Sequence, residues 1–246
     1  MRSGLHSTYV LHHRPYPDTS LLLEAFCAEH GRVGLVARGV NRPKSRWKGL
    51  LQPFVPLIAS WTGRGELGTL TVAEEAAPPL PIPAGRLLSG LYVNELLVRL
   101  LPRDDPHPGL FTAYEDVVKA LRDLAPEEAA LRVFEKRLLA ALGYGLLLER
   151  DSRDGTPVRP DGVYHYVPEH GPVAACDAGV GAGIVRISGG SLLALQREEF
   201  DDANALREIK RLTRVAIAVC LEGRPLRTRE LWLRKCKINS GGRIGP

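Results

Sequence analysis

Residues 7–40 read STYVLHHRPYPDTSLLLEAFCAEHGRVGLVARGV, in which short apolar runs alternate with the turn sequences RPYPD and EHG. Two further runs, LLQPFVPLIASW (50–61) and ELGTLTVAEE (66–75), follow the turn sequences NRPKS and TGRG. Apolar or alternating runs bounded by Gly, Pro, Asn and Asp predict β-strands. Five such strands without a helical period between them predict a small antiparallel barrel. An OB-fold is the first candidate, and the strand count alone leaves an SH3-like barrel open.

The composition changes after this barrel. EAAPPLPIPAG (75–85) carries four prolines and predicts a linker, because neither a central strand nor a helix interior accepts them. Helical periodicity then predicts helices at 85–102, 108–124, 125–145, 191–200, 202–223 and 224–236, with loops and short strands at 146–190. The predicted class is α+β, with an all-β and an all-α domain. The predicted limits are 1–78 for the OB-fold domain, 79–236 for the helical domain with its loop and short-strand insertion, and 237–246 for a flexible basic tail.

Composition excludes several classes of protein. A hydrophobic content of 44% and a charged content of 25% are typical of a globular protein. The polar N-terminus and the absence of an apolar run of about 18 residues predict a cytoplasmic location. The four cysteines form no CxxC pair and are expected to be reduced thiols: Cys27, Cys176, Cys220 and Cys236.

A basic segment at residues 31–65 carries seven cationic side chains and no Asp or Glu, although 28 acidic residues in 246 would place about four in such a window. Phosphates can replace the counterions of such a segment, so it predicts DNA binding that weakens with salt. A solvated loop is the alternative. Trp47, in the charged loop NRPKSRWK, is the candidate for stacking on unpaired bases, whereas Phe54 and Trp61 are expected in the barrel core. The basic candidates are Arg32, Arg38, Arg42, Lys44, Arg46, Lys48 and Arg64.

A second basic region lies near the C-terminus, where residues 207–246 hold eleven Lys or Arg against three Glu. Arg207, Lys210, Arg211 and Arg214 follow the spacing i, i+3, i+4 and i+7, which places them on one helix face. That face either binds DNA or is solvated. With the barrel segment, it would allow two strands to be held together.

The third predicted helix places cations beside apolar side chains. Basic groups around an apolar groove suit a short acidic peptide with bulky residues, and an ordinary amphipathic helix is the alternative. The residues are Arg132, Lys136 and Arg137 with Leu131 and Phe134.

No catalytic residue, metal site or cofactor site is expected. The sequence contains no P-loop, GxSxG or HExxH motif. The acidic pairs Asp104/Asp105 and Asp151/Asp154 lie in Pro- and Gly-containing loops, where solvated turn residues are common. His12 and His13 are adjacent on a predicted strand and point to opposite faces. We therefore expect a protein without enzymatic activity.

The run YVLHHRPYPDTSLLLEAFCAEHGRVGLVARGVNRPKSRWKGLLQPFVPL, followed by GRGEL, resembles the N-terminal barrel of the RecO family of bacterial recombination mediators. SGLYVNELLVRLL (89–101), ALRVFEKRLLAALGYG (130–145) and REEFDDANALREIKRLTR (197–214) resemble its second half. The resemblance covers about residues 8–235. Many RecO proteins carry a four-cysteine zinc module where this chain has residues 149–177. Only Cys176 falls there, so a zinc-less variant is expected.

The resemblance implies DNA repair and recombination without nucleotide hydrolysis. It implies binding of single- and double-stranded DNA and annealing of complementary strands, including strands coated by single-stranded-DNA-binding protein (SSB). Implied partners are RecR, RecF in many bacteria, RecA indirectly, and the acidic, Phe-ended tail of SSB, for which the groove around Arg132 is the expected dock. A nucleoid-associated location follows. The alternative is another OB-fold protein that binds single-stranded RNA.

Overall fold

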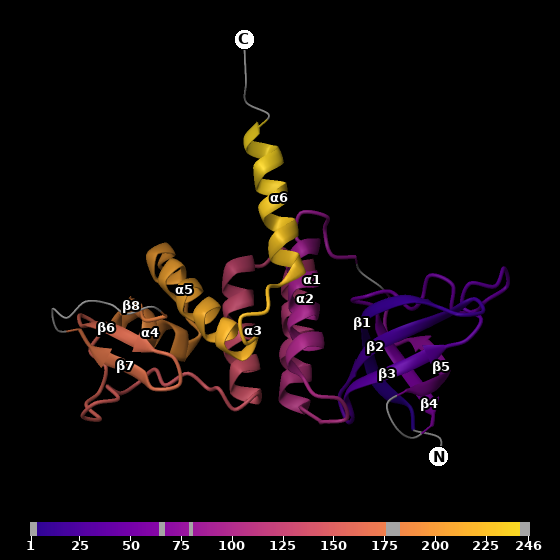
Figure 1. The fold of residues 1–246 in the computed structure, drawn as a ribbon, viewed down its shortest axis with the longest axis horizontal. Coiled ribbons are helices and arrows are strands. Elements are labelled where there is room, and N and C mark those ends of the chain that lie inside the picture. Colours follow the sequence, from indigo (N-terminus) through magenta and orange to yellow (C-terminus); the bar gives the residue numbers. More distant parts are fainter. Residues whose placement is uncertain (1–3, 64–66, 79–80, 176–182, 242–246) are drawn as a thin grey trace, which may run out of the picture. The chain divides into compact units, whose positions relative to one another are not determined.

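The structure, a computed structural model, describes residues 4–63, 67–78, 81–175 and 183–241, with side chains described through residue 234 (Figure 1). The chain forms two compact units. The first comprises Met1–Asp123 together with Pro225–Pro246, and the second comprises Leu124–Arg224. The first two helices after the barrel therefore group with it, although the change of composition near residue 78 predicts a domain limit there.

The first unit contains a closed five-stranded barrel, drawn in indigo and violet in Figure 1. Its strands are β1 (His6–Tyr16), β2 (Ser20–Cys27), β3 (Gly31–Ala37), β4 (Pro56–Thr62) and β5 (Gly68–Glu75). They pair in the order β1-β2-β3-β5-β4, and β1 closes the barrel against β4. Among the described strand pairs of the barrel, β3 and β5 alone run parallel. This confirms the predicted barrel, and its architecture is that of an OB-fold.

The run SLLLEAFC of β2 is buried along nearly its whole length, because both faces of the strand are covered. Leu23 and Ala25 lie in the barrel core. The ring of Phe26 instead contacts the rings of Phe111 and Tyr114 on a neighbouring helix. A strand with two apolar faces thus joins the barrel to the helices of its own unit.

Three helices complete the first unit: α1 (Leu87–Leu100), α2 (Pro108–Arg122) and α6 (Arg227–Gly241). Asn94 of α1 is buried, donates from Nδ2 to the Leu11 carbonyl of β1 at 2.8 Å, and accepts from the Tyr114 hydroxyl at 2.9 Å. The LYVNELL motif therefore supplies a satisfied polar tie between barrel and helices. α6 continues to Gly241 rather than ending at residue 236, because KINS contains no helix breaker, and residues 242–246 of the predicted tail lie outside the described part.

The second unit contains α3 (Glu127–Ala141), β6 (Val163–Val167), β7 (Gly171–Ala174), β8 (Val185–Ser188), α4 (Gly189–Arg197) and α5 (Ala203–Cys220). The strands form an antiparallel sheet in the order β7-β6-β8. Its core joins Tyr164, Tyr166 and Ile187 of the sheet to Leu192 and Ile209 of the helices. This confirms helices with a loop and short-strand insertion. Within the described residues, no helix is sufficiently long and apolar to cross a membrane.

Asp151 organises the insertion in the region 149–177, which holds a single cysteine. Its side chain is buried, and its carboxylate accepts from the Arg153 amide at 2.8 Å and from the Ala174 amide at 2.6 Å. The Ser152 amide donates to the Pro172 carbonyl. The carboxylate thus fastens this loop to the end of β7, and the Ser152 amide fastens it to Pro172 near the start of β7. Cys176 lies outside the described residues.

Candidate nucleic-acid interface

Residues 38–48, which we call the basic loop, follow β3 in the connection to β4. Successive turns fold it, with the amide of Ser45 donating to the Arg42 carbonyl at 3.0 Å and that of Lys48 donating to the Ser45 carbonyl at 3.3 Å. Val40 and Trp47 enter the barrel core, as does Leu51 just beyond the loop. These apolar residues anchor the loop at both ends, so its polar side chains must face outward.

Five cations of the loop are exposed: Arg38, Arg42, Lys44, Arg46 and Lys48. Arg46 has local partners, since its Nη2 donates to the Thr71 carbonyl at 2.9 Å and its guanidinium lies 4.9 Å from the Trp47 ring centroid. Within the described ranges, no ion pair or hydrogen bond engages the side chains of the other four. Cations without a neutralising carboxylate remain available to phosphate oxygens.

Trp47 does not present a stacking surface, and this prediction was wrong. Only 8% of Trp47 is exposed, and its ring packs with the barrel core. No described residue forms a hydrogen bond with the buried indole Nε1, so the burial rests on apolar contact. A lone tryptophan in a charged loop shows no periodicity that would reveal its inward direction. Phe54 is buried, at 7% exposed, but its ring lies beside Gly90 of α1 rather than among the barrel-core residues.

Arg32 is also unavailable, in contrast to its predicted role. Its Nη1 donates to Glu24 at 2.9 Å and its Nε donates to the Leu101 carbonyl at 2.9 Å. Arg103 approaches the other oxygen of the same carboxylate. Arg32 therefore ties β3 to β2 and to the end of α1. Arg64, the remaining predicted cation, lies outside the described residues.

The second basic surface lies on α5, in the second unit. Its buried face is formed by residues such as Ile209, Leu212 and Ile217. Arg211 and Arg214 are exposed. Lys210 is half-buried in an ion pair with Glu128 at 2.7 Å, and Arg207 bonds to Asn204 and to the Ala203 carbonyl of its own helix. The predicted helix and its basic face exist, and Arg207, Arg211 and Arg214 are its exposed members.

Glu208, on the same helix, points elsewhere. Its Oε2 accepts from the Ser188 amide at 2.9 Å, the Ser188 hydroxyl at 2.8 Å and the Ser191 hydroxyl at 2.7 Å. Burial acts to raise the pKa of this carboxyl, but these hydrogen bonds and nearby Arg211 together lower it below its ordinary value. Glu208 thus stabilises the start of α4 through hydrogen bonds.

The prediction of a peptide-binding groove on α3 was wrong, because Arg132, Leu131 and Phe134 are buried. Arg132 is 4% exposed and pairs with Glu135, which is 1% exposed, at 2.7 Å. Leu131 and Phe134 are buried core residues, and α3 packs against α5 and α4. The helix therefore buries the face that the sequence placed around a groove.

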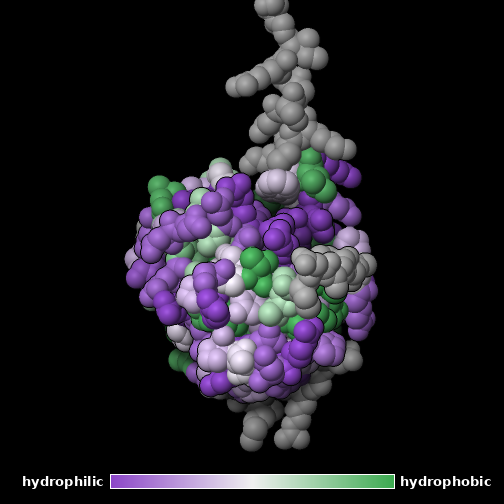
Figure 2. All heavy atoms as spheres, turned by 90° about the vertical axis from the view of Figure 1, so that its left-hand side faces the viewer, coloured by the Kyte–Doolittle hydropathy of each residue, from purple (hydrophilic) through white to green (hydrophobic). Residues whose placement is uncertain are grey.

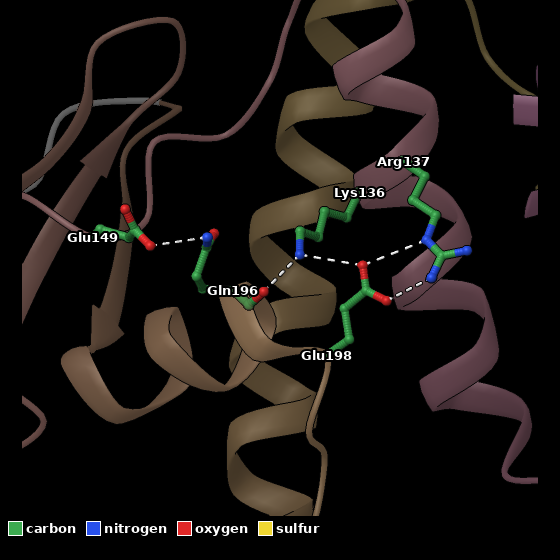
Figure 3. Close-up of polar contacts among 5 residues, drawn as sticks. All are labelled: Lys136, Arg137, Glu149, Gln196 and Glu198. Atoms are coloured by element: carbon green, nitrogen blue, oxygen red, sulfur yellow. Dashed lines mark hydrogen bonds and ion pairs between the residues drawn. The ribbon is translucent and has the colours of Figure 1, made fainter. Parts of the chain in front are cut away.

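The two remaining cations of α3 are held by one carboxylate, as Figure 3 shows. Lys136 donates to the Gln196 carbonyl at 2.7 Å and to Glu198 at 3.2 Å, and Arg137 donates to Glu198 at 2.8 Å. Burial acts to raise the pKa of Glu198, but the bonds from Arg137 and Lys136 outweigh it and lower the pKa. This acid lies about 60 residues away in the chain, so local sequence gives no sign of the pairing.

A hollow that the sequence did not predict lies in the second unit, with a volume of about 270 Å³. It is lined by the turn Gly143–Leu147, by Tyr166, Pro168 and Glu169, and by Val219 of α5. Tyr144 and Leu147 are strongly exposed there, at 45% and 56%. Figure 2 shows one face of the molecule, which is largely hydrophilic with small separate hydrophobic areas among its described residues.

Comparison with known proteins agrees with this geometry. The family model described as "Recombination protein O N terminal" matches residues 1–78, and "Recombination protein O C terminal" matches residues 84–230. "DNA repair protein RecO" of Alkalilimnicola ehrlichii is 48% identical over 91% of this chain and 88% of its own length. The protein of that name from Nitrosococcus oceani is 45% identical over 94% of this chain and 93% of its own length. The one from Photobacterium profundum is 39% identical over 95% of this chain and 98% of its own length. The chain therefore belongs to the RecO family of DNA repair proteins.

Proposed function

We propose that this chain is a DNA repair mediator that binds single- and double-stranded DNA and anneals complementary strands, including strands coated by SSB. In cooperation with RecR, and with RecF where it is present, it helps RecA to load. No covalent step is involved. Family membership supports the repair role. The observation that supports DNA binding is the cation set of the basic loop, exposed on an OB barrel.

The proposed mechanism relies on charge. Arg38, Arg42, Lys44 and Lys48 neutralise the phosphates of one strand and release its condensed counterions. Arg211 and Arg214 of α5 offer a second cationic surface, on the other unit. Neutralising two backbones lowers their mutual repulsion, so complementary bases can pair without an energy source.

Recruitment through the acidic tail of SSB completes the proposal, because tethering raises the local concentration of the protein at coated DNA. The dock is not the predicted α3 groove. Arg132 is buried, and Glu198 already engages Lys136 and Arg137.

The test is annealing of complementary oligonucleotides, bare or coated with full-length or tail-less SSB. The wild-type chain should accelerate both reactions, with the coated reaction slowed when the tail is removed. The triple variant Arg42→Ala, Lys44→Ala, Lys48→Ala should lose acceleration on bare strands. A control that removes three exposed arginines of the second unit, Arg150→Ala, Arg159→Ala and Arg186→Ala, should retain it.

An unchanged annealing rate in the basic-loop variant would contradict the proposal. A competition assay separates the alternative class of protein. Preference for a single-stranded RNA over DNA of the same sequence would indicate an RNA-binding OB protein instead.

A further inference from the structure

Ligand-type side chains of three kinds meet where β1 begins and β2 ends. His6 opens β1, Cys27 closes β2, and Glu29 lies in the turn toward β3. The antiparallel register Thr8↔Cys27 and the bond from the Ala28 amide to the Ser7 carbonyl bring His6 opposite Glu29. The Nδ1 of His6 lies 3.2 Å, and the Sγ of Cys27 3.4 Å, from the same oxygen, Oε2 of Glu29.

The ligand atoms fit the dimensions of a small transition-metal site. All three lie within 4.8 Å of one another. Zinc bonds of about 2.0–2.3 Å in tetrahedral geometry require ligand atoms roughly 3.3–3.8 Å apart. The two separations to Glu29 already agree with this range to about 0.1 Å.

Neighbouring rings orient His6 so that its Nδ1 faces the Glu29 carboxylate. The Nε2 of His30 lies 3.3 Å from the Nε2 of His6, on the side of the ring away from Glu29. Trp61 packs against both rings, with centroids 5.4 Å from His6 and 5.3 Å from His30. A hydrogen bond at one ring nitrogen fixes the tautomer that presents the other to a metal, as second-shell partners commonly do.

Burial and charge indicate which kind of ion the cluster would bind. Cys27 is fully buried, the His6 side chain is 15% exposed and the Glu29 side chain 56% exposed, so the cluster opens to solvent on one side. A thiolate and a carboxylate together balance a divalent cation. Calcium and magnesium prefer oxygen ligands alone, whereas zinc accepts nitrogen, sulfur and oxygen. Three protein ligands and a solvent-side fourth position match an open zinc site.

We propose that His6, Cys27 and Glu29 bind one zinc ion, with His30 as the hydrogen-bond partner that orients His6. Binding releases the thiol proton of Cys27 to solvent, and the fourth ligand is water. The ion would fasten the first residue of β1 to the β2–β3 turn. The sequence predicted no metal site because positions 6, 27 and 29 match no ligand spacing, and only strand register brings them together.

The experiment uses the full chain, freed of metal with a chelator and then titrated with cobalt(II) as a spectroscopic substitute for zinc. One equivalent should produce visible d–d absorption and a near-ultraviolet thiolate-to-cobalt charge-transfer band, both removed by added zinc. Cys27→Ser should abolish the charge-transfer band, and the matched control Cys220→Ser should keep it. Zinc should also raise the melting temperature of the wild type and not that of His6→Ala or Glu29→Gln.

His30 gives a further readout, because loss of an outer-shell partner lowers metal affinity by about 10–100-fold. His30→Ala should show this loss, while the control His12→Ala should not. Cys27 is buried, so its variant could fail to fold. The partly exposed positions His6 and Glu29 keep the test valid, with circular dichroism as the check of folding. No charge-transfer band with excess cobalt, or a band that survives Cys27→Ser or His6→Ala, would overturn the proposal.

Discussion

The guanidinium of Arg46 lies over the ring of its neighbour Trp47, 4.9 Å from the ring centroid. Trp47 points into the barrel, and Arg46 covers the ring from the solvent side and also donates to the Thr71 carbonyl. Such cation–π contacts stabilise by about 0.5–1 kcal/mol at exposed sites. Arg46 therefore contributes to the conformation of the basic loop. Arg42, Lys44 and Lys48, which lack such contacts within the described residues, are the better phosphate ligands.

The salt dependence of DNA binding tests this assignment. Replacing Arg42, Lys44 and Lys48 with alanine should weaken binding to single-stranded DNA. It should also reduce the slope of log affinity against log salt by about 2, since each phosphate contact contributes about 0.7. Fluorescence anisotropy of a labelled oligonucleotide at several salt concentrations measures the slope. The Arg150, Arg159 and Arg186 alanine variant should keep the wild-type slope, and an equal loss in both would assign the effect to net charge.

Much of the fold could be predicted because its signals are local. The barrel strands follow apolar runs bounded by turn residues, and α2 and α5 follow clear helical periods, with Asp202 capping α5 through the amides of Asn204 and Ala205. The outward direction of the loop cations also follows from composition, since five charges cannot be buried together. The barrel closure and the β7-β6-β8 sheet were consistent with the pattern of short strands.

The predictions of available cations that were wrong concern side chains whose partners lie far away in the sequence. Glu198 neutralises Lys136 and Arg137 from 61 or 62 residues away. Arg32 is removed from the surface by Glu24 and by the carbonyl of Leu101. In each case a cation that looked free was matched by a group that only the folded chain brings near. Charge patterning identifies candidate cations, but tertiary structure decides which remain available.

Trp47 should behave as a core residue rather than a stacking platform. Trp47→Ala should lower the free energy of unfolding by about 3–5 kcal/mol, as large-to-small core substitutions do, measured by urea denaturation. Trp47→Phe should leave affinity for single-stranded DNA unchanged, whereas loss of a stacked base would cost about 1–3 kcal/mol. Trp232→Phe, at a residue that is 52% exposed, is the stability control. Weaker DNA binding by a fully folded Trp47→Phe protein would restore the stacking hypothesis.

The start of α6 should give the first unit a measurable sensitivity to acid. Glu95 of α1 accepts from the amides of Arg227 and Thr228 at 2.8 and 2.9 Å and from the Thr228 hydroxyl at 2.7 Å. Burial acts to raise the pKa of Glu95, but these bonds and Arg99 lower it below its ordinary value. The resulting stability is complete above the unfolded pKa of about 4.3 and is lost as the pH falls through the lower folded value.

Glu95→Gln should therefore cost about 1–2 kcal/mol at neutral pH, by weakening a carboxylate cap at a helix N-terminus. The difference from wild type should shrink as the pH falls below about 4. Thermal unfolding between pH 7 and pH 3 measures both effects. Glu230→Gln, at an exposed residue in the first turn of α6, should differ little from wild type throughout. A Glu95 effect that is independent of pH would show that the carboxylate charge is not involved.

The ion pair between Arg132 and Glu135 should be structural. Breaking a buried pair by removing one partner costs about 3–5 kcal/mol, because the remaining charge stays in the interior, whereas replacing both partners with apolar residues is often neutral or stabilising. We expect Arg132→Ala to be strongly destabilised and the double variant Arg132→Met, Glu135→Leu to recover most of that loss, as measured by urea denaturation. The exposed Arg211→Ala variant should have a stability close to that of the wild type.

If Arg132→Ala instead kept full stability and lost only binding to the SSB tail, Arg132 would have to lie on an accessible docking surface. The double variant then separates the two roles, because restoring stability without a guanidinium would not restore binding to an acidic tail.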